Sequence, residues 1–194
     1  MNWLGTIFLS MFASNALLSW GFGFRSGFKS GQYRQGRWIA WLLALNIIAS
    51  LILWLSSRFI LLPLGIASLI ALVYALFVVP TLRAISRAFS VFPIIAPESA
   101  LAGIDELSLS SLVFGISLIA MRGAGSLAEC LLASIVSVLG WWAAVALLDA
   151  IEKRTEAGAL PEAMKGAPAI LLSAALMAMT MTLAGVALAQ GVGK

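Results

Sequence analysis

The sequence DAIEKRTEAGALPEAMKGA (residues 149–167) separates two long apolar segments and decides the fold class. It holds seven of the chain's 20 charged residues, whereas the flanking segments, residues 127–148 and 168–189, are apolar over 22 residues each. A helix of about 20 apolar residues crosses the hydrocarbon layer of a bilayer. We therefore predict that residues 149–167 form a water-facing loop between two transmembrane helices, and solvation alone accounts for its charges.

The composition of the whole chain agrees with this interpretation. Of its 194 residues, 62% are hydrophobic and 10% are charged, against about 25% charged residues in soluble domains. The mean hydropathy is +1.05. These values predict an integral membrane protein that is almost entirely embedded, and topology explains the net charge of +4 better than nucleic-acid binding does.

Cysteine and histidine usage restricts the possible chemistry. Cys130 is the single cysteine, so the chain alone can form neither an internal disulfide nor a multi-cysteine metal site. The absence of histidine removes the commonest general base and metal ligand. No nucleophile motif, phosphate-binding loop or dinucleotide fingerprint is present, so we expect neither a catalytic site nor a bound metal in this chain. At position 130 the thiol is expected to act as a small hydrophobic side chain.

Apolar segments separated by charged residues predict six transmembrane helices. We place them at residues 3–24, 38–55, 59–79, 107–121, 127–148 and 168–189. The fourth is short for a crossing, so residues 94–104 are expected to supply the missing length as a re-entrant or broken half-helix. Residues 1–92 and 93–194 then form two three-helix repeats within one membrane domain.

Three helices per half make the halves opposite in orientation, which is the arrangement of an inverted repeat. The first helix of each half is the irregular one. In the first half, Gly21, Gly23 and Gly27 allow either a glycine-rich helix end or a broken helix that lines a buried site. Broken helices at corresponding positions of two halves indicate a site near the midplane.

Lysine and arginine counts predict the orientation of the chain. The connections after the first, third and fifth helices carry nine of these residues, and the opposite side carries three. The positive-inside rule places the nine in the cytoplasm, so both termini are expected outside. The expected location is a bacterial-type inner membrane.

Three polar residues within the predicted helices are candidates for function. Glu129 lies three residues into the fifth helix and is either an interfacial carboxylate or a functional buried one. Asn15 and Asn46 are expected to form hydrogen bonds between helices, with a role in an ion path as the alternative.

Several segments resemble the Rnf/Nqr membrane-subunit family, and in particular its Rnf A-type member. This family contains the paired six-helix subunits of the Rnf complex and of the sodium-translocating NADH:quinone oxidoreductase. The similarity covers most of the chain and is carried by four segments: FILLPLGI (residues 59–66), VFGISL (113–118), DAIEKRTE (149–156) and PEAMKGAPAILLSAALM (161–177). The last is the most specific.

The resemblance implies a mid-membrane [2Fe–2S] cluster held by cysteines from the first and fourth helices of two paired subunits. Matching the family's cysteine turns to this chain places Gly23 and Ser111 at the cysteine positions, with Ser110 at a neighbouring asparagine. Glycine offers no ligand and serine is a poor iron ligand. We therefore expect no cofactor in this chain, with flavin and iron–sulfur groups confined to partner subunits.

Two functions remain open at this level. The resemblance implies a membrane subunit of an ion-translocating electron-transport complex, paired with a homologous six-helix partner. The alternative is a transporter for a small solute or ion that reuses the same inverted-repeat fold.

Overall fold

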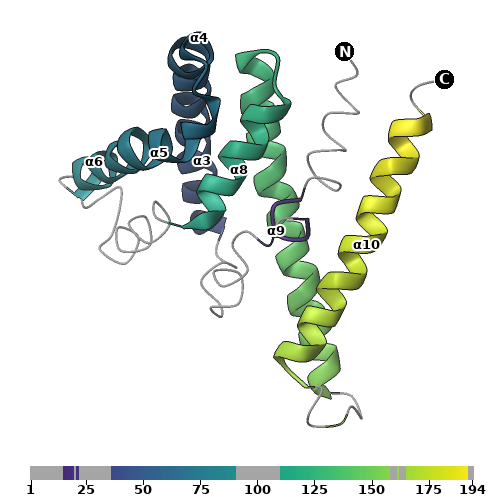
Figure 1. Ribbon diagram of the computed structural model, residues 1–194. Coiled ribbons are helices and arrows are strands. Elements are labelled where there is room, and N and C mark those ends of the chain that lie inside the picture. Colours follow the sequence, from purple (N-terminus) through teal and green to yellow (C-terminus); the bar gives the residue numbers. More distant parts are fainter. Residues whose placement is uncertain are drawn as a thin grey trace.

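The computed structural model describes residues 15–19, 21, 36–90, 110–157, 161 and 165–191. Over these ranges the chain is helical and forms no strand. Three helices lie together at the centre of Figure 1: α3 (Gly36–Ser56), α8 (Ser111–Gly123) and α9 (Leu127–Ala157). A further long helix, α10 (Ala167–Gly191), meets α9 near its start and diverges from it toward the C-terminus (Figure 1).

Three helices in the described ranges are long and apolar enough to cross a membrane. They are Ile39–Leu64, Leu127–Thr155 and Ala167–Ala184. The apolar helices Ile70–Ile85 and Ser111–Arg122 are shorter. These lengths and compositions indicate a membrane protein, and the all-helical part of the predicted fold class is confirmed.

The core forms where α3, α8 and α9 meet. Trp141 of α9 is the largest side chain that is fully buried there. Small residues on α3 and α9 allow the helices to approach closely, as is usual for helices in membranes. The remaining buried members of the core are Ala16, Leu17, Leu42, Leu45, Ala49, Leu53, Tyr74, Val78, Leu82, Leu112, Val113, Ile116, Val138, Ala144 and Leu148.

The predicted helix over residues 59–79 is wrong in its boundaries. The first long helix does not stop near Arg58 but continues through the π-helical turn η3 (Ser57–Leu61) and α4 (Leu62–Leu64). The helix ends at Gly65, whose φ of +67° glycine adopts without strain. Arginine has good helix propensity, so a single charge at position 58 does not end a helix.

The second helix of this region is built from four short pieces. These are η4 (Ala67–Leu69), α5 (Ile70–Val73), the π-helical turn η5 (Tyr74–Val78) and α6 (Val79–Ser90). In Figure 1, α5 and α6 extend to one side of α3 rather than alongside it. The helix therefore continues past Pro80, which the sequence pattern placed near its end.

Each proline in this region lies two residues after the last residue of a π-helical turn. The Leu62 amide donates to Ser57 O before Pro63, and the Val79 amide donates to Tyr74 O before Pro80. A proline has no N–H, and its ring collides with the carbonyl four residues earlier in a regular α-helix. A wider π turn just before the proline moves that carbonyl, so the helical path is preserved.

The charged stretch that begins at Asp149 is a loop only in part. Helix α9 continues through it to Ala157, because its side chains favour helix and Lys153 Nζ pairs with Asp149 Oδ2 at 2.8 Å, one turn away. Pro161, Lys165 and Gly166 follow as described residues of the connection. Helix α10 then contains the whole predicted sixth span.

The two helices predicted to be irregular are described in part. Residues 15–19 form a helical turn, and Gly21 after it has a φ of +67°. Gly23, Gly27 and residues 94–104 lie outside the described residues. Helix α8 has 13 residues, too few for a crossing on its own.

Candidate functional site

A row of buried polar side chains runs between α3 and α9. Ser50 on α3 donates a hydrogen bond to Ser134 on α9, with 3.0 Å between their oxygens. The Cys130 thiol approaches Ser50 O at 3.8 Å. Asn46 and Ser137 lie on the same two helices, and all five side chains are buried. We call these five residues the polar seam.

The contacts fix how the two helices run. Ser50 contacts Ser134, whereas Trp54, one turn further along α3, packs on the cluster that contains Cys130, one turn earlier on α9. The helices are therefore antiparallel. One turn before Ser50 on α3 is Asn46, and one turn after Ser134 on α9 is Ser137, so these two residues lie at the same level.

The amide of Asn46 is only half satisfied among the described residues. Its Nδ2 donates to Leu42 O in the preceding turn at 3.2 Å, and its Oδ1 has no hydrogen-bond partner. The bond that the amide does form is thus within α3, not between helices as predicted. The side chain is fully buried, so an acceptor is held in an apolar setting.

The hydroxyl of Ser137 also lacks a hydrogen-bond partner in the described part of the chain. This differs from Ser117 on α8, whose Oγ donates to Val113 O at 2.7 Å. Serine in an apolar helix commonly makes such a bond to the carbonyl four residues earlier. Ser137 does not, although it is equally buried.

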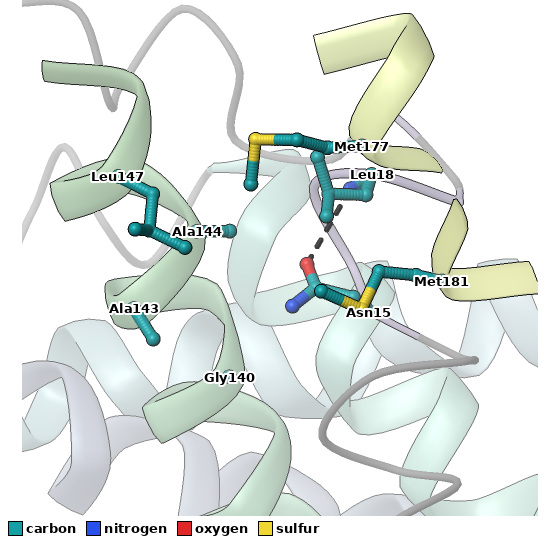
Figure 2. Close-up of a pocket in the computed structure, with 8 residues that line it drawn as sticks. All are labelled: Asn15, Leu18, Gly140, Ala143, Ala144, Leu147, Met177 and Met181. Atoms are coloured by element: carbon teal, nitrogen blue, oxygen red, sulfur yellow. Dashed lines mark hydrogen bonds between the residues drawn. The ribbon is translucent and has the colours of Figure 1, made fainter. Parts of the chain in front are cut away.

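Asn15 occupies a different place, at the edge of a small apolar cleft. Its Oδ1 accepts hydrogen bonds from the amides of Leu17 and Leu18, at 3.0 and 3.4 Å, and so caps the helical turn that follows. Figure 2 shows this side chain with Met177 and Met181 of α10, opposite the Ala143–Leu147 face of α9.

Glu129 has a structural role at the start of α9. Its Oε2 accepts from the amides of Gly125 and Ser126 at 2.8 and 3.3 Å, while Ser126 Oγ accepts from the Glu129 amide at 3.3 Å. This reciprocal pair is a capping box. The sequence signal was available as SLAE (residues 126–129), a serine followed three residues later by glutamate before an apolar run.

The position matched to the family's second cysteine lies at the start of α8. Ser110 is the N-cap residue, and its Oγ accepts from the Val113 amide at 3.5 Å. Ser111 is the first helical residue and is exposed. Gly23, the match to the first cysteine, is outside the described ranges.

The part of the chain that the structure describes contains no set of side chains that could bind a metal ion. No group of three or more Cys, Asp or Glu side chains gathers there. Cys130 is a buried free thiol that packs among apolar side chains and approaches the Ser50 carbonyl, as expected for a small hydrophobic residue. Serines at close helix contacts usually serve to let helices approach, so the sequence pattern alone does not mark Ser134 and Ser137 as members of the polar seam.

No model of a protein family matches this chain, and no curated protein matches it.

Proposed function

We propose that this protein is a membrane subunit of an Rnf/Nqr-type ion-translocating electron-transport complex and has no iron–sulfur cluster of its own. The observation that carries the proposal is the start of α8. The resemblance expects an irregular fourth helix with a ligand turn at residues 110–111, and α8 is short and begins at those residues with a serine cap. A helix that starts at this turn can present its first residues to a partner.

The chain's own residues are poor ligands for the family's cluster. Ser110 Oγ is engaged in capping, and Gly23 has no side chain. Cys130 is on α9 with its sulfur toward Ser50 O, so it could supply at most one thiolate, whereas such clusters are held by four cysteines or a similar set. In this proposal flavin and iron–sulfur groups belong to partner subunits.

The proposed topology has six transmembrane helices in two inverted three-helix repeats, with both termini outside a bacterial-type inner membrane. The long helices Ile39–Leu64, Leu127–Thr155 and Ala167–Ala184 supply three crossings. Tilted helix η4–α6 and the shorter α8 would contribute to two more, and residues 3–24 to the sixth. Nine lysines and arginines on one side support the orientation.

The proposed partner is a homologous six-helix subunit. Apolar side chains of α10 are exposed along much of its length, and both lipid and a second apolar helix bundle fit such a surface. The most exposed of these side chains are Leu171, Leu172, Leu176, Met179 and Leu183. The exposed Ser111 at the start of α8 is the position from which we expect the partner to be reached.

The polar seam favours one second candidate, a transporter for a small solute or ion. Buried polar groups near the middle of apolar helices are costly and often mark a transport path. This function would need no redox partners, so partner identity separates the two candidates.

Purification of the tagged chain from native membranes in mild detergent tests the proposal. We expect a complex that contains a second six-helix subunit and subunits with flavin or iron–sulfur groups. A folded monomer, or a complex with a solute-binding protein, would contradict it. The isolated chain should contain neither iron nor acid-labile sulfide in stoichiometric amounts.

Crosslinking refines this experiment. In a Cys130→Ser background, Ser111→Cys should crosslink to the partner subunit. Ala128→Cys, which is also exposed but lies in the first turn of α9, is the matched control and should not. Equal crosslinking at both positions would show that the start of α8 is not a specific contact.

A further inference from the structure

Two buried polar atoms, one on each helix of the polar seam, have no hydrogen-bond partner among the described residues. They are Asn46 Oδ1 on α3 and Ser137 Oγ on α9. Both side chains have no exposed area. One atom can only accept a hydrogen bond, and the other can donate one, so the two are complementary.

The register of the helices brings these residues to one level. The Ser50–Ser134 bond fixes the antiparallel pairing, and Asn46 and Ser137 each lie about one turn from it in the direction that keeps the helices matched. Asn46 lies seven residues from the start of the apolar helix Ile39–Leu64, and Ser137 lies ten residues from the start of Leu127–Thr155. The pair is therefore expected inside the hydrocarbon layer, where no bulk water can satisfy it.

Water is the ligand that suits this pair. A buried water molecule typically makes about three hydrogen bonds to polar groups that would otherwise be unsatisfied. It can donate to Asn46 Oδ1 and accept from the Ser137 hydroxyl. The orientation of the Asn46 amide supports this assignment, because Nδ2 is already engaged with Leu42 O and leaves Oδ1 as the acceptor.

A cation suits the site less well. The polar seam offers neutral oxygens and a thiol but no carboxylate. Glu129, two turns before Ser137 on α9, is held in the capping box at the helix start. A monovalent ion between these helices would thus lack a compensating charge. Burial of an unpaired charge is far more costly than burial of a hydrogen-bonded neutral group.

We propose that Asn46 and Ser137 bind an ordered water molecule between α3 and α9, one turn from the direct Ser50–Ser134 bond. The water joins two helices that would otherwise each bury an unsatisfied group. This inference does not depend on the proposed function.

Thermal unfolding of the purified chain in detergent gives the first test. Asn46→Leu and Ser137→Ala should each lower the midpoint by about 2–6 °C, since each leaves the water and its remaining partner unsatisfied. The double variant should be no less stable than the worse single variant. Midpoints that rise in the single variants, or losses that add, would overturn the proposal, because an atom without any partner is better replaced by an apolar group.

Infrared spectroscopy gives the second test and does not require equal stability of the variants. We expect an O–H stretching band that shifts when H₂¹⁶O is exchanged for H₂¹⁸O. The band should be present in the wild type and in Ser117→Ala, whose hydroxyl is already paired, and absent in Asn46→Leu. A band that persists in Asn46→Leu, or no ¹⁸O-sensitive band in the wild type, would refute the water. So would a midpoint that depends on sodium or potassium against choline, which would indicate a cation.

Discussion

Ser126 and Glu129 cap each other at the N-terminus of α9, with the serine oxygen 3.3 Å from the glutamate amide and the glutamate oxygen 3.3 Å from the serine amide. A carboxylate that looks like an intramembrane functional group is thereby explained by the unpaired amides of a helix start. The next amide back, that of Gly125, is satisfied by the same carboxylate. The helix dipole adds a further favourable term for a negative charge at this end.

The capping box predicts that Glu129→Ala lowers the free energy of unfolding by about 1 kcal/mol. Glu129→Gln should retain most of the stability, because glutamine also occupies this position in capping boxes. Thermal unfolding of both variants in detergent checks the prediction. A Gln variant as impaired as the Ala variant would show that the charge itself matters, and would return Glu129 to the list of functional candidates.

The substitution Tyr74→Phe is expected to stabilise the protein. Its hydroxyl is buried and has no hydrogen-bond partner among the described residues, while its ring meets that of Phe114 edge-on with centroids 4.7 Å apart. Tyr74→Phe removes the unpaired hydroxyl and keeps the ring contact, so the free energy of unfolding should rise by up to about 1–2 kcal/mol. Tyr74→Leu is the control and should be less stable than Tyr74→Phe, because it loses the aromatic pair. A loss of stability in Tyr74→Phe would indicate that the hydroxyl has a partner.

Substitution of Gly65 is expected to lower the stability of the protein because of backbone geometry alone. A Cβ at this position would meet nothing within 4 Å, yet φ is +67°. Gly65→Ala should therefore cost about 1 kcal/mol through the left-handed conformation, and Gly65→Asn less, since asparagine tolerates it better. Unfolding midpoints of the two variants provide the measurement. Equal stability of wild type and Gly65→Ala would mean that the helix ends in another way.

Single-cysteine labelling checks the proposed orientation of the chain. In a Cys130→Ser background, we expect Ser30→Cys and Gly158→Cys to react with an impermeant reagent only from the cytoplasmic side. Ala124→Cys, in the turn between α8 and α9, should react from the opposite side. Labelling of Ser30→Cys and Gly158→Cys from the outside would reverse the orientation, and labelling of these two from opposite sides would remove a crossing.

The sequence alone determined the class of the protein and the helices with the longest apolar runs. Residues 127–148 and 168–189 are too apolar and too long to be anything but buried or lipid-facing helices, and α9 and α10 contain them entirely. These features depend on side-chain hydrophobicity summed over many residues, which no single contact can reverse.

Only the tertiary structure decided where helices end and which polar groups remain unpaired. The sequence pattern placed helix ends near Arg58 and Pro80. In the structure the helices continue through π-helical turns before Pro63 and Pro80, and the first of them ends at Gly65. A proline's effect depends on the hydrogen bonds of the preceding turn, which a sequence pattern does not contain. Likewise, Ser117 and Ser137 are both serines in apolar helices, yet one hydroxyl is paired and the other is not. A sequence pattern does not contain the side-chain rotamer and packing on which such a hydrogen bond depends.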